Sequence, residues 1–336
     1  MTVKVSKAAL NLREELADLR KPSSIAGEAL LRADSVQEQR DLIGAGRRNL
    51  LINGDMRVVQ RGTTFTRSGS GWGYFGSMDR WAVYYGNTVF NQTTGIIDGQ
   101  YKHYARITNN GTAPDNYFIY QKIENGSRIL SGKEITISFM AKSANSTPLR
   151  VRGRFFDHAL ESGSTDSGLK MFSLTPEWQK YSYTYTPVDT STNLTRDFTI
   201  IIDTNGVNGL SDGYDITNVQ LELGSVATEF EHRSYGEELA LCQRYFYQMS
   251  SSGSGYIASI VNRGIRYMTD KIPSMRGTPA LSYDNAQVSV DGGNYTNVTP
   301  SIVSYTDGGN VLIALGSGSN DEDVLFYGNL KYDAEL

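Results

Sequence analysis

From about residue 47 onward, apolar and polar positions of the chain alternate with a period of two. Three runs show this most clearly: Ile135–Phe139, Tyr181–Tyr185 and Val219–Leu223. Phe198–Ile202 alternates imperfectly, because Ile201 is also apolar, and is expected to be buried on both faces. Successive side chains of a strand point to opposite faces, so this period predicts strands. Clusters of Gly, Asn and Asp separate the runs, as turns do. Strands punctuated in this way predict an antiparallel β-sandwich over residues 47–235.

The first 46 residues follow a helical pattern instead. Ser6 can cap a helix that continues to Arg20, and Ser35–Glu38 is a capping box in front of a second helix. The first helix is too short to be stable alone in water, and the second has the clearer start and end signals. We therefore interpret residues 1–46 as an attachment arm whose apolar side chains pack against other copies of the chain or against a partner. The alternative is a frayed tail.

The segment 236–255 joins the sandwich to a second set of strands. Gly236–Cys242 contains good helix formers, the residues after it predict a strand, and Ser250–Gly255 has the composition of a flexible linker. Residues 256–336 hold short apolar runs separated by Gly-rich turns, which predicts a small C-terminal β domain. A domain of about 80 residues buries only about 60% of its unfolded surface, so this one needs further support.

The charge balance argues against several classes of protein. The chain has 32 Lys and Arg against 36 Asp and Glu, a formal net charge of −4, which is not that of a basic nucleic-acid-binding protein. No apolar run approaches the roughly 20 residues of a membrane-spanning helix, and the charged first residues do not resemble an export signal. We therefore expect no nucleic acid as a partner and no membrane insertion. The single cysteine, Cys242, excludes an internal disulfide and a cysteine metal cluster.

The sequence carries no recognisable catalytic motif. None of the three His residues lies four positions from another, as in a zinc-protease helix, and no Gly-x-Ser-x-Gly nucleophile motif occurs. Gly71–Gly76 fits the Gly-x-Gly-x-x-Gly pattern of a dinucleotide loop, but a predicted strand follows it where such a loop needs a helix. We expect a non-catalytic protein. A pair of carboxylates that cleaves a glycan is the alternative, because a sequence does not show their separation.

Several segments resemble proteins of known families. Three resemble the opening of a domain that is common in bacteriophage tail fibres: Arg47–Met56, Gln60–Thr63 and Asp79–Trp81. Three others resemble the end of that domain: Ile216–Gly224, Thr228–Glu231 and Glu237–Tyr245. Two stretches resemble the C-terminal regions of fibre proteins: Ile272–Pro279 and Leu330–Leu336. The outline is also similar to jelly-roll carbohydrate-binding modules, through the strand that closes on Lys142–Ser143 and the strand Asp215–Leu221.

The resemblance implies a mainly β fold with short N-terminal helices, an antiparallel jelly-roll β-sandwich and a small C-terminal β domain. It also implies a homotrimer, in which apolar runs such as Val311–Leu315 pack between chains. On this interpretation the protein lies on the virion, at the tail or particle surface, and residues 1–46 dock on a tail or capsid protein. It binds host-surface polysaccharide or lipopolysaccharide for attachment and has no catalytic activity.

Three other roles fit the same segments: a purely structural virion or capsid-decorating fibre without receptor binding, a glycan-cleaving tail spike, and a secreted glycan-binding module. The missing export signal argues against the last. No cofactor is expected, although jelly-roll modules of this type often carry a structural calcium ion near their first and last strands. Asp215 matches the family position on the last strand, whereas Asp55 stands one residue before the family's usual Glu.

Aromatic side chains supply the first candidate contacts, because the C–H faces of sugars stack on aromatic rings while their hydroxyls need polar partners. The candidates come from one Gly-rich stretch and the strand after it: Trp72, Tyr74, Phe75, Tyr84 and Tyr85. The first three are expected in an exposed loop. The other two Trp residues, Trp81 and Trp178, border apolar alternations and are assigned to the core. The alternating Tyr181, Tyr183 and Tyr185 are expected to be half-buried and to pack in the interior of the sandwich.

Arginine side chains supply the second set of candidate contacts. Arg150, Arg152 and Arg154 alternate along one strand and therefore share a face. Three guanidinium groups in a row can hold an acidic polysaccharide or a lipopolysaccharide phosphate. The alternative is a solvated sheet face on which they pair with acidic side chains of a neighbouring strand.

Overall fold

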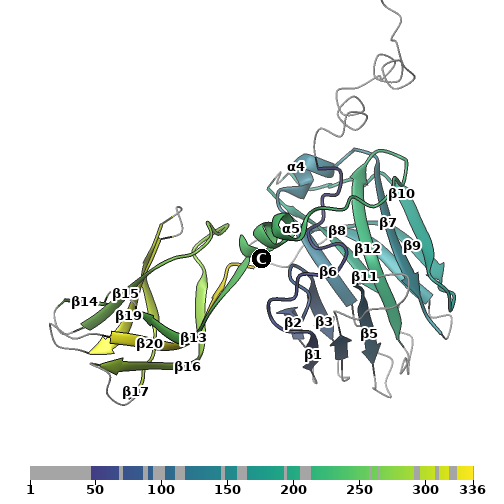
Figure 1. The fold of residues 1–336 in the computed structure, drawn as a ribbon. Coiled ribbons are helices and arrows are strands. Elements are labelled where there is room, and N and C mark those ends of the chain that lie inside the picture. Colours follow the sequence, from purple (N-terminus) through teal and green to yellow (C-terminus); the bar gives the residue numbers. More distant parts are fainter. Residues whose placement is uncertain are drawn as a thin grey trace, which may run out of the picture. The chain divides into compact units, whose positions relative to one another are not determined.

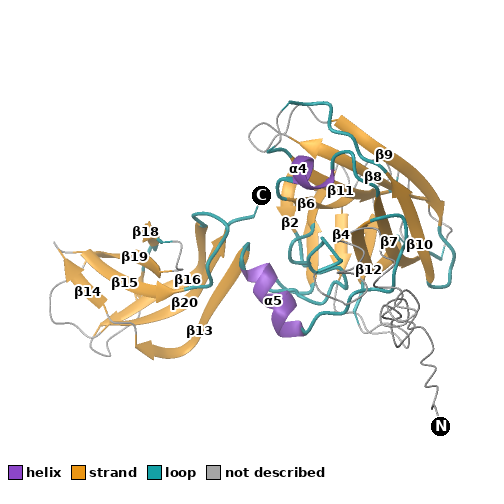
Figure 2. Ribbon diagram, turned by 90° about the horizontal axis from the view of Figure 1, so that it is seen from above, coloured by secondary structure: helices purple, strands orange, loops and turns teal. Residues whose placement is uncertain are grey.

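The computed structural model describes residues 47–67, 71–85, 90–93, 103–109, 118–144, 148–156, 165–192, 195–204, 213–256, 259–262, 265–290, 296–306, 310–317 and 324–335. The predicted N-terminal helices at 1–46 lie outside the described residues. Residues Asn49–Leu336 form one compact unit. Strands dominate it, and no helix in the described part of the chain is long and apolar enough to cross a membrane (Figure 2).

Two sheets make up the N-terminal part of this unit (Figure 1), and each of them has six strands. The first, which we call the β12 sheet, has the order β1 (Thr64–Arg67), β4 (Phe90–Thr93), β5 (Ala105–Asn109), β12 (Tyr214–Leu223), β7 (Ile135–Lys142), β10 (Gln179–Tyr185). The second, the β11 sheet, has the order β2 (Gly71–Phe75), β3 (Ala82–Tyr85), β6 (Phe118–Ile123), β11 (Asp197–Asp203), β8 (Pro148–Phe156), β9 (Thr165–Ser173). The pairs are antiparallel, which confirms the predicted β-sandwich.

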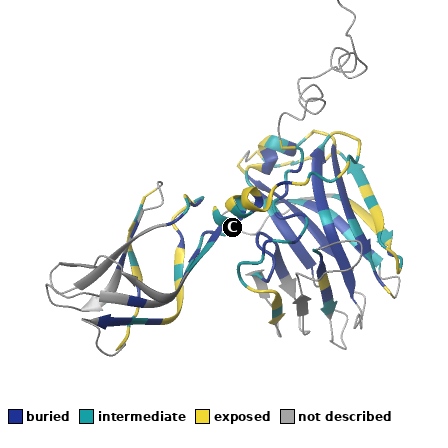
Figure 3. Cartoon of the chain, viewed as in Figure 1, coloured by how far each residue is buried: buried dark blue, intermediate teal, exposed yellow. Residues whose placement is uncertain are grey.

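The core of the sandwich consists of the apolar side chains that the alternation identified. Ile137 and Phe139 of β7 are fully buried, as are Val151 of β8 and Ile200 of β11. Figure 3 colours the inner strands of the sandwich mostly as buried. Trp81 is also fully buried and donates its indole N–H to the Asn53 carbonyl at 3.0 Å, which confirms its assignment to the core. The three alternating tyrosines of β10 are partly buried and pack against this core, as predicted.

Tyr185 occupies a space that exists because residue 153 is Gly. A Cβ atom on Gly153 would lie 2.2 Å from the Tyr185 hydroxyl oxygen and 2.4 Å from Cζ of Phe198. The Tyr185 ring also lies against Gly168, which has a φ of +72° that other residues rarely adopt. Both glycines are therefore required by the packing of one tyrosine.

We predict that Gly153→Ala lowers the free energy of unfolding by about 1–3 kcal/mol, the usual effect of overpacking a core. Urea unfolding followed by tryptophan fluorescence measures the change. Gly277→Ala is the matched control, because a Cβ atom there would meet nothing within 4 Å. Equal stabilities of the two variants would show that the tyrosine moves aside without cost.

The chain leaves the sandwich through α5 (Tyr235–Gln243), which begins where the Ser234 hydroxyl accepts the Glu237 N–H at 3.2 Å. A shorter helix, α4 (Gly126–Leu130), follows β6. After α5, β13 (Phe246–Tyr256) includes Ser250–Gly255, so the prediction of a flexible linker there is wrong. These residues form a strand because β20 (Val324–Asp333) pairs with it, with a register shift between Ser251 and Gly255.

The C-terminal strands form two four-stranded sheets. One has the order β13, β20, β16 (Ala280–Val290), β17 (Thr296–Asn297), and the other has the order β14 (Ser259–Asn262), β15 (Ile265–Lys271), β19 (Asn310–Ser317), β18 (Ser301–Tyr305). Val311 and Ile313 of β19 are buried in a core shared with Phe326, Leu330 and Tyr332 of the same chain. These two side chains therefore do not pack between chains, contrary to the expectation for the run Val311–Leu315.

Candidate functional site

The aromatic candidates lie on two paired strands of the β11 sheet. Trp72, Tyr74 and Phe75 belong to β2, which pairs with β3, so the expected exposed loop is instead a strand. Tyr84 and Tyr85 belong to β3, where Tyr84 is opposite Phe118 of β6. Apart from Phe75, the side chains of these five residues lie outside the description. Phe75 is partly buried and its ring lies 5.3 Å from the Arg61 guanidinium carbon.

The arginine candidates lie on β8, and an acid of the neighbouring strand holds two of them. Arg150 and Arg152 each donate Nε to Asp203 of β11, at 2.8 Å and 3.1 Å, and Asp203 is fully buried. Arg154 is opposite Thr199 in the register of the same strands. This arrangement corresponds to the alternative stated with the prediction, a sheet face on which the arginines pair with a neighbouring acid.

The segments that resemble the two ends of a fibre domain bind each other. The Asn49 side chain donates to the Val219 carbonyl and accepts the Leu221 N–H, both at 3.1 Å. The backbone continues this pairing, because Leu50 N donates to Leu221 O and Val219 N donates to Gly54 O, both at 2.9 Å. The opening segment therefore lines the part of β12 that β5 does not reach.

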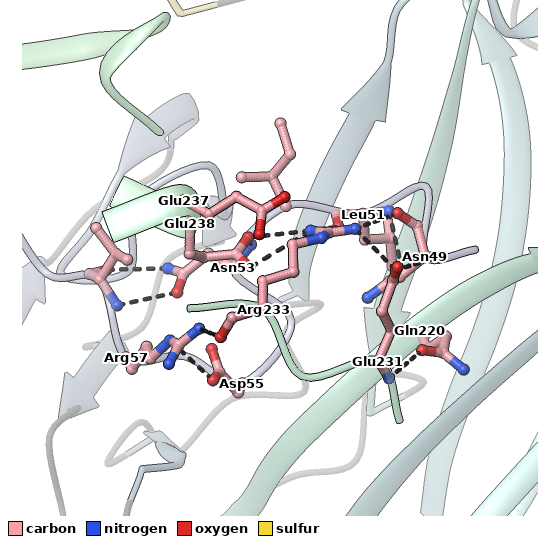
Figure 4. Close-up of polar contacts among 12 residues, drawn as sticks. Asn49, Leu51, Asn53, Asp55, Arg57, Gln220, Glu231, Arg233, Glu237 and Glu238 are labelled. Atoms are coloured by element: carbon pink, nitrogen blue, oxygen red, sulfur yellow. Dashed lines mark hydrogen bonds and ion pairs between the residues drawn. The ribbon is translucent and has the colours of Figure 1, made fainter. Parts of the chain in front are cut away.

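Arg233 completes this junction between the two segments. Its guanidinium donates to the Leu51 and Asn49 carbonyls and to Glu238, which in turn accepts the Asn53 N–H (Figure 4). Arg233 and Glu238 are both buried. The specific sequence of these segments therefore serves to close the sandwich, and we assign the junction no ligand.

The outer face of the β12 sheet carries a different kind of cluster. Arg106 of β5 is opposite Asp215 of β12, and Asp215 is opposite Lys142 of β7. Trp178 comes immediately before Gln179, which is opposite Ala141, so Trp178 continues the line beside Lys142. We call these four residues the Trp178 row. It crosses β5, β12 and β7 and ends just before β10, on the side of the sheet away from the core.

The side chains of the Trp178 row contact one another. Arg106 donates Nε and Nη2 to the two oxygens of Asp215, at 2.7 Å and 2.8 Å. The Lys142 ammonium lies 4.0 Å from Asp215 and 4.7 Å from the centre of the Trp178 ring. The ring of Tyr104, which is buried, meets the edge of Trp178 with a centroid distance of 5.4 Å. The hydrogen bonds that Arg106 donates to Asp215 raise the pKa of Arg106, so Arg106 stays positively charged at any physiological pH.

The row combines a half-buried indole with accessible charges. The side chain of Arg106 is 46% exposed and that of Lys142 is 24% exposed, whereas Asp215 beneath them is only 5% exposed. The segment after β12 covers the other end of this face, where Thr136 and Thr184 donate to the carbonyls of Gly224 and Ser225. The Trp178 row lies at the opposite end of β7 from Thr136. This end therefore offers a ring and fixed polar groups side by side.

The prediction that Trp178 belongs to the core is wrong, because Trp178 lies on the outer face at intermediate exposure. The position of Trp178 in the two-residue alternation already indicated the outer face. The core-packed residues of β10 are Tyr181, Tyr183 and Tyr185, so Trp178 shares a face with Lys180 instead. Proximity to an apolar run suggested burial, but the period of two decides the face.

The carboxylates considered for calcium are engaged in ion pairs. Asp215 binds Arg106, and Asp55 lies 3.0 Å from Nε of Arg57. Burial raises the pKa of Asp55, against the opposite effect of Arg57. The described residues include no group of three or more His, Cys, Asp or Glu side chains placed to hold a metal ion.

The comparisons with known proteins find similarity of structure alone. No family model and no curated protein matches the chain. A family 4 carbohydrate-binding module is similar at 20% identity over 51% of this chain and 98% of its own, with a TM-score of 0.30. A family 11 carbohydrate-binding module of a Clostridium thermocellum cellulase is similar at 16% identity over 48% and 99%, with a TM-score of 0.31. The enzymatically active domain of tailspike protein 4 from bacteriophage CBA120 is similar at 17% identity over 52% of this chain and 21% of that one, with a TM-score of 0.33. All three similarities are distant.

Proposed function

We propose that the protein binds carbohydrate without transforming it, and that the Trp178 row is the contact site. The observation that carries the proposal is the placement of a half-buried indole beside Lys142, Asp215 and Arg106 on the outer face of one sheet. A sugar ring needs this pair of features, an aromatic surface for its C–H face and charged or polar groups for its hydroxyls.

The polar part of the row is held in place before a ligand arrives. Asp215 fixes the Arg106 guanidinium through two hydrogen bonds and attracts the Lys142 ammonium from the other side. Side chains that are already ordered lose less conformational freedom on binding, which favours affinity. Arg106, Asp215 and Lys142 lie on three adjacent strands and are therefore spaced by about 4.8 Å, and Trp178 continues their line just before β10 begins. Several sugar units of one chain can therefore lie across the row.

We further propose that this binding serves attachment, with the protein as a fibre on a phage tail or particle surface. The segments that resemble tail-fibre domains support this role, and a homotrimer would multiply weak single-site affinities through avidity. On this proposal residues 1–46 dock on a tail or capsid protein and the ligand is a host-surface polysaccharide or lipopolysaccharide. A structural fibre without receptor binding is the competing role.

An array of bacterial surface polysaccharides tests the proposal with three full-length proteins: the unchanged chain, Trp178→Ala and Tyr283→Ala. We expect the unchanged chain to bind a subset of glycans and Trp178→Ala to bind them at least about tenfold more weakly, a loss of about 1.4 kcal/mol. Tyr283 is 38% exposed on β16, so its variant controls for the loss of an exposed aromatic ring. Binding by Trp178→Ala equal to that of the unchanged chain would refute the site, and no binding by any of the three proteins would favour the structural fibre.

A further inference from the structure

The last described residues of the chain form ion pairs with arginines of the sandwich. Glu335 pairs with Arg80, and both side chains are almost completely buried, at 3% and 2% exposure. Arg61 lies 3.3 Å from Asp333 and 3.5 Å from Glu335, and on its other side 3.3 Å from Asp79. Residues more than 250 positions apart in sequence therefore share one network of charges.

Arg80 is held in an unusual conformation at the centre of this network. It lies in the turn between β2 and β3 with a φ of +71°, in the left-handed region that residues other than Gly rarely adopt. Its guanidinium lies 3.5 Å from the centre of the Tyr245 ring and donates to the Lys122 carbonyl at 3.1 Å. Such backbone strain persists only where the surroundings fix the residue, and here Glu335 and Tyr245 do so.

A second set of bonds continues from the same tyrosine. The Ala334 N–H donates to the Tyr245 carbonyl at 2.7 Å, and the Tyr245 hydroxyl donates to Glu124 at 2.5 Å. Arg276 of the C-terminal domain lies 3.3 Å from Glu124 and also donates to the Ala334 carbonyl at 3.3 Å. The chain end thus joins the sandwich, the α5–β13 connection and the C-terminal strands.

We propose that residues Asp333–Glu335 act as a latch that couples the C-terminal β domain to the sandwich. While Glu335 is paired with Arg80, the two domains unfold as one cooperative body. When the pair is lost, Arg80 is left as a buried charge without its carboxylate, and the strained turn loses its support. The C-terminal domain then separates from the sandwich as an independent unit.

The test compares two signals during thermal unfolding of the full chain. All three Trp residues, Trp72, Trp81 and Trp178, precede α5, so tryptophan fluorescence follows the sandwich alone, whereas calorimetry follows both domains. We expect the unchanged chain to give one calorimetric transition that coincides with the fluorescence change. Glu335→Gln should split it, with a first calorimetric transition at least about 5 °C below the fluorescence midpoint. Arg276→Met should act in the same direction.

The control is Asp284→Asn, which removes an exposed ion pair with Lys331 within the C-terminal domain and outside the latch. It should keep the transitions coincident. The latch is refuted if Glu335→Gln and Arg276→Met both keep coincident transitions, or if the unchanged chain already unfolds in two separate steps. If Glu335→Gln does not fold, the splitting in Arg276→Met decides.

Discussion

Arg233→Met should lower the free energy of unfolding of the sandwich by about 3–5 kcal/mol, the usual effect of removing one partner from a buried ion pair. Arg233 is 8% exposed and lies 3.2 Å from Glu238, which is itself 4% exposed. The variant leaves the Glu238 carboxylate buried with the Asn53 N–H but without its cation. It also removes the donor to the Leu51 carbonyl at 3.1 Å. Met preserves most of the volume of the Arg233 side chain, so the decrease in the free energy of unfolding measures the loss of its polar contacts.

Urea unfolding followed by tryptophan fluorescence measures this difference. Arg128→Met is the matched control, because Arg128 is an exposed arginine of α4 and surface substitutions of this kind usually change stability by less than about 0.5 kcal/mol. Should Arg233→Met prove as stable as the control, the junction between the opening and closing segments would not be what closes the sandwich.

The second large effect is a dependence of stability on pH that originates at Asp79. Burial raises the pKa of this carboxyl from 3.8 to about 6, and the nearby charge of Glu335 acts in the same direction. The Arg61 cation and the Gln60 side-chain amide, which donates to Asp79 at 2.5 Å, act in the opposite direction. The Cys242 thiol, whose pKa burial raises, is a further ionisable group that interacts with Asp79. Burial has the largest effect, so the folded protein disfavours the charged form.

The sign follows from the direction of the shift. Between about pH 4 and pH 6 the folded state binds a proton at Asp79 that the unfolded state has released. Stability from this group is therefore fully present below pH 3.8 and is lost as the pH rises to about 6. A shift of about two units corresponds to about 3 kcal/mol.

The measurement is the free energy of unfolding of the unchanged chain minus that of Asp79→Asn, taken by urea unfolding at several values between pH 3 and pH 7.5. The subtraction removes the contribution of other titrating groups. We expect the difference to fall by about 3 kcal/mol as the pH rises. A difference that is flat, or that increases with pH, would mean that Asp79 is well solvated or strongly stabilised as the anion.

The fold was largely predictable because alternation reports which side of a strand is buried. Phe139, Ile200 and Leu221 all lie in the core, as their patterns indicate. Ser250–Gly255 was not predictable in the same way, because small polar residues suit a linker and a strand equally well. The pairing with β20 decided the outcome, and that is a contact with a distant part of the chain.

The candidate site was less predictable than the fold. That Arg150 and Arg152 share Asp203 depends on how β8 aligns with β11, and these residues are more than 50 positions apart. The Trp178 row likewise depends on the register of β5, β12 and β7. The face on which Trp178 lies could be predicted from its position in the two-residue alternation. Local patterns indicate faces, whereas sites on a sheet depend on long-range register.

The most direct test of carbohydrate binding observes the three tryptophan indole N–H signals by NMR while the strongest-binding array polysaccharide, cut to short oligosaccharides, is added. Trp→Phe variants assign the three signals. We predict a saturable shift of the Trp178 signal and an unchanged Trp81 signal, because Trp81 is buried and donates to the Asn53 carbonyl. A Trp178 signal that stays in place while the oligosaccharide binds would contradict the assignment of the site to the outer face of the β12 sheet.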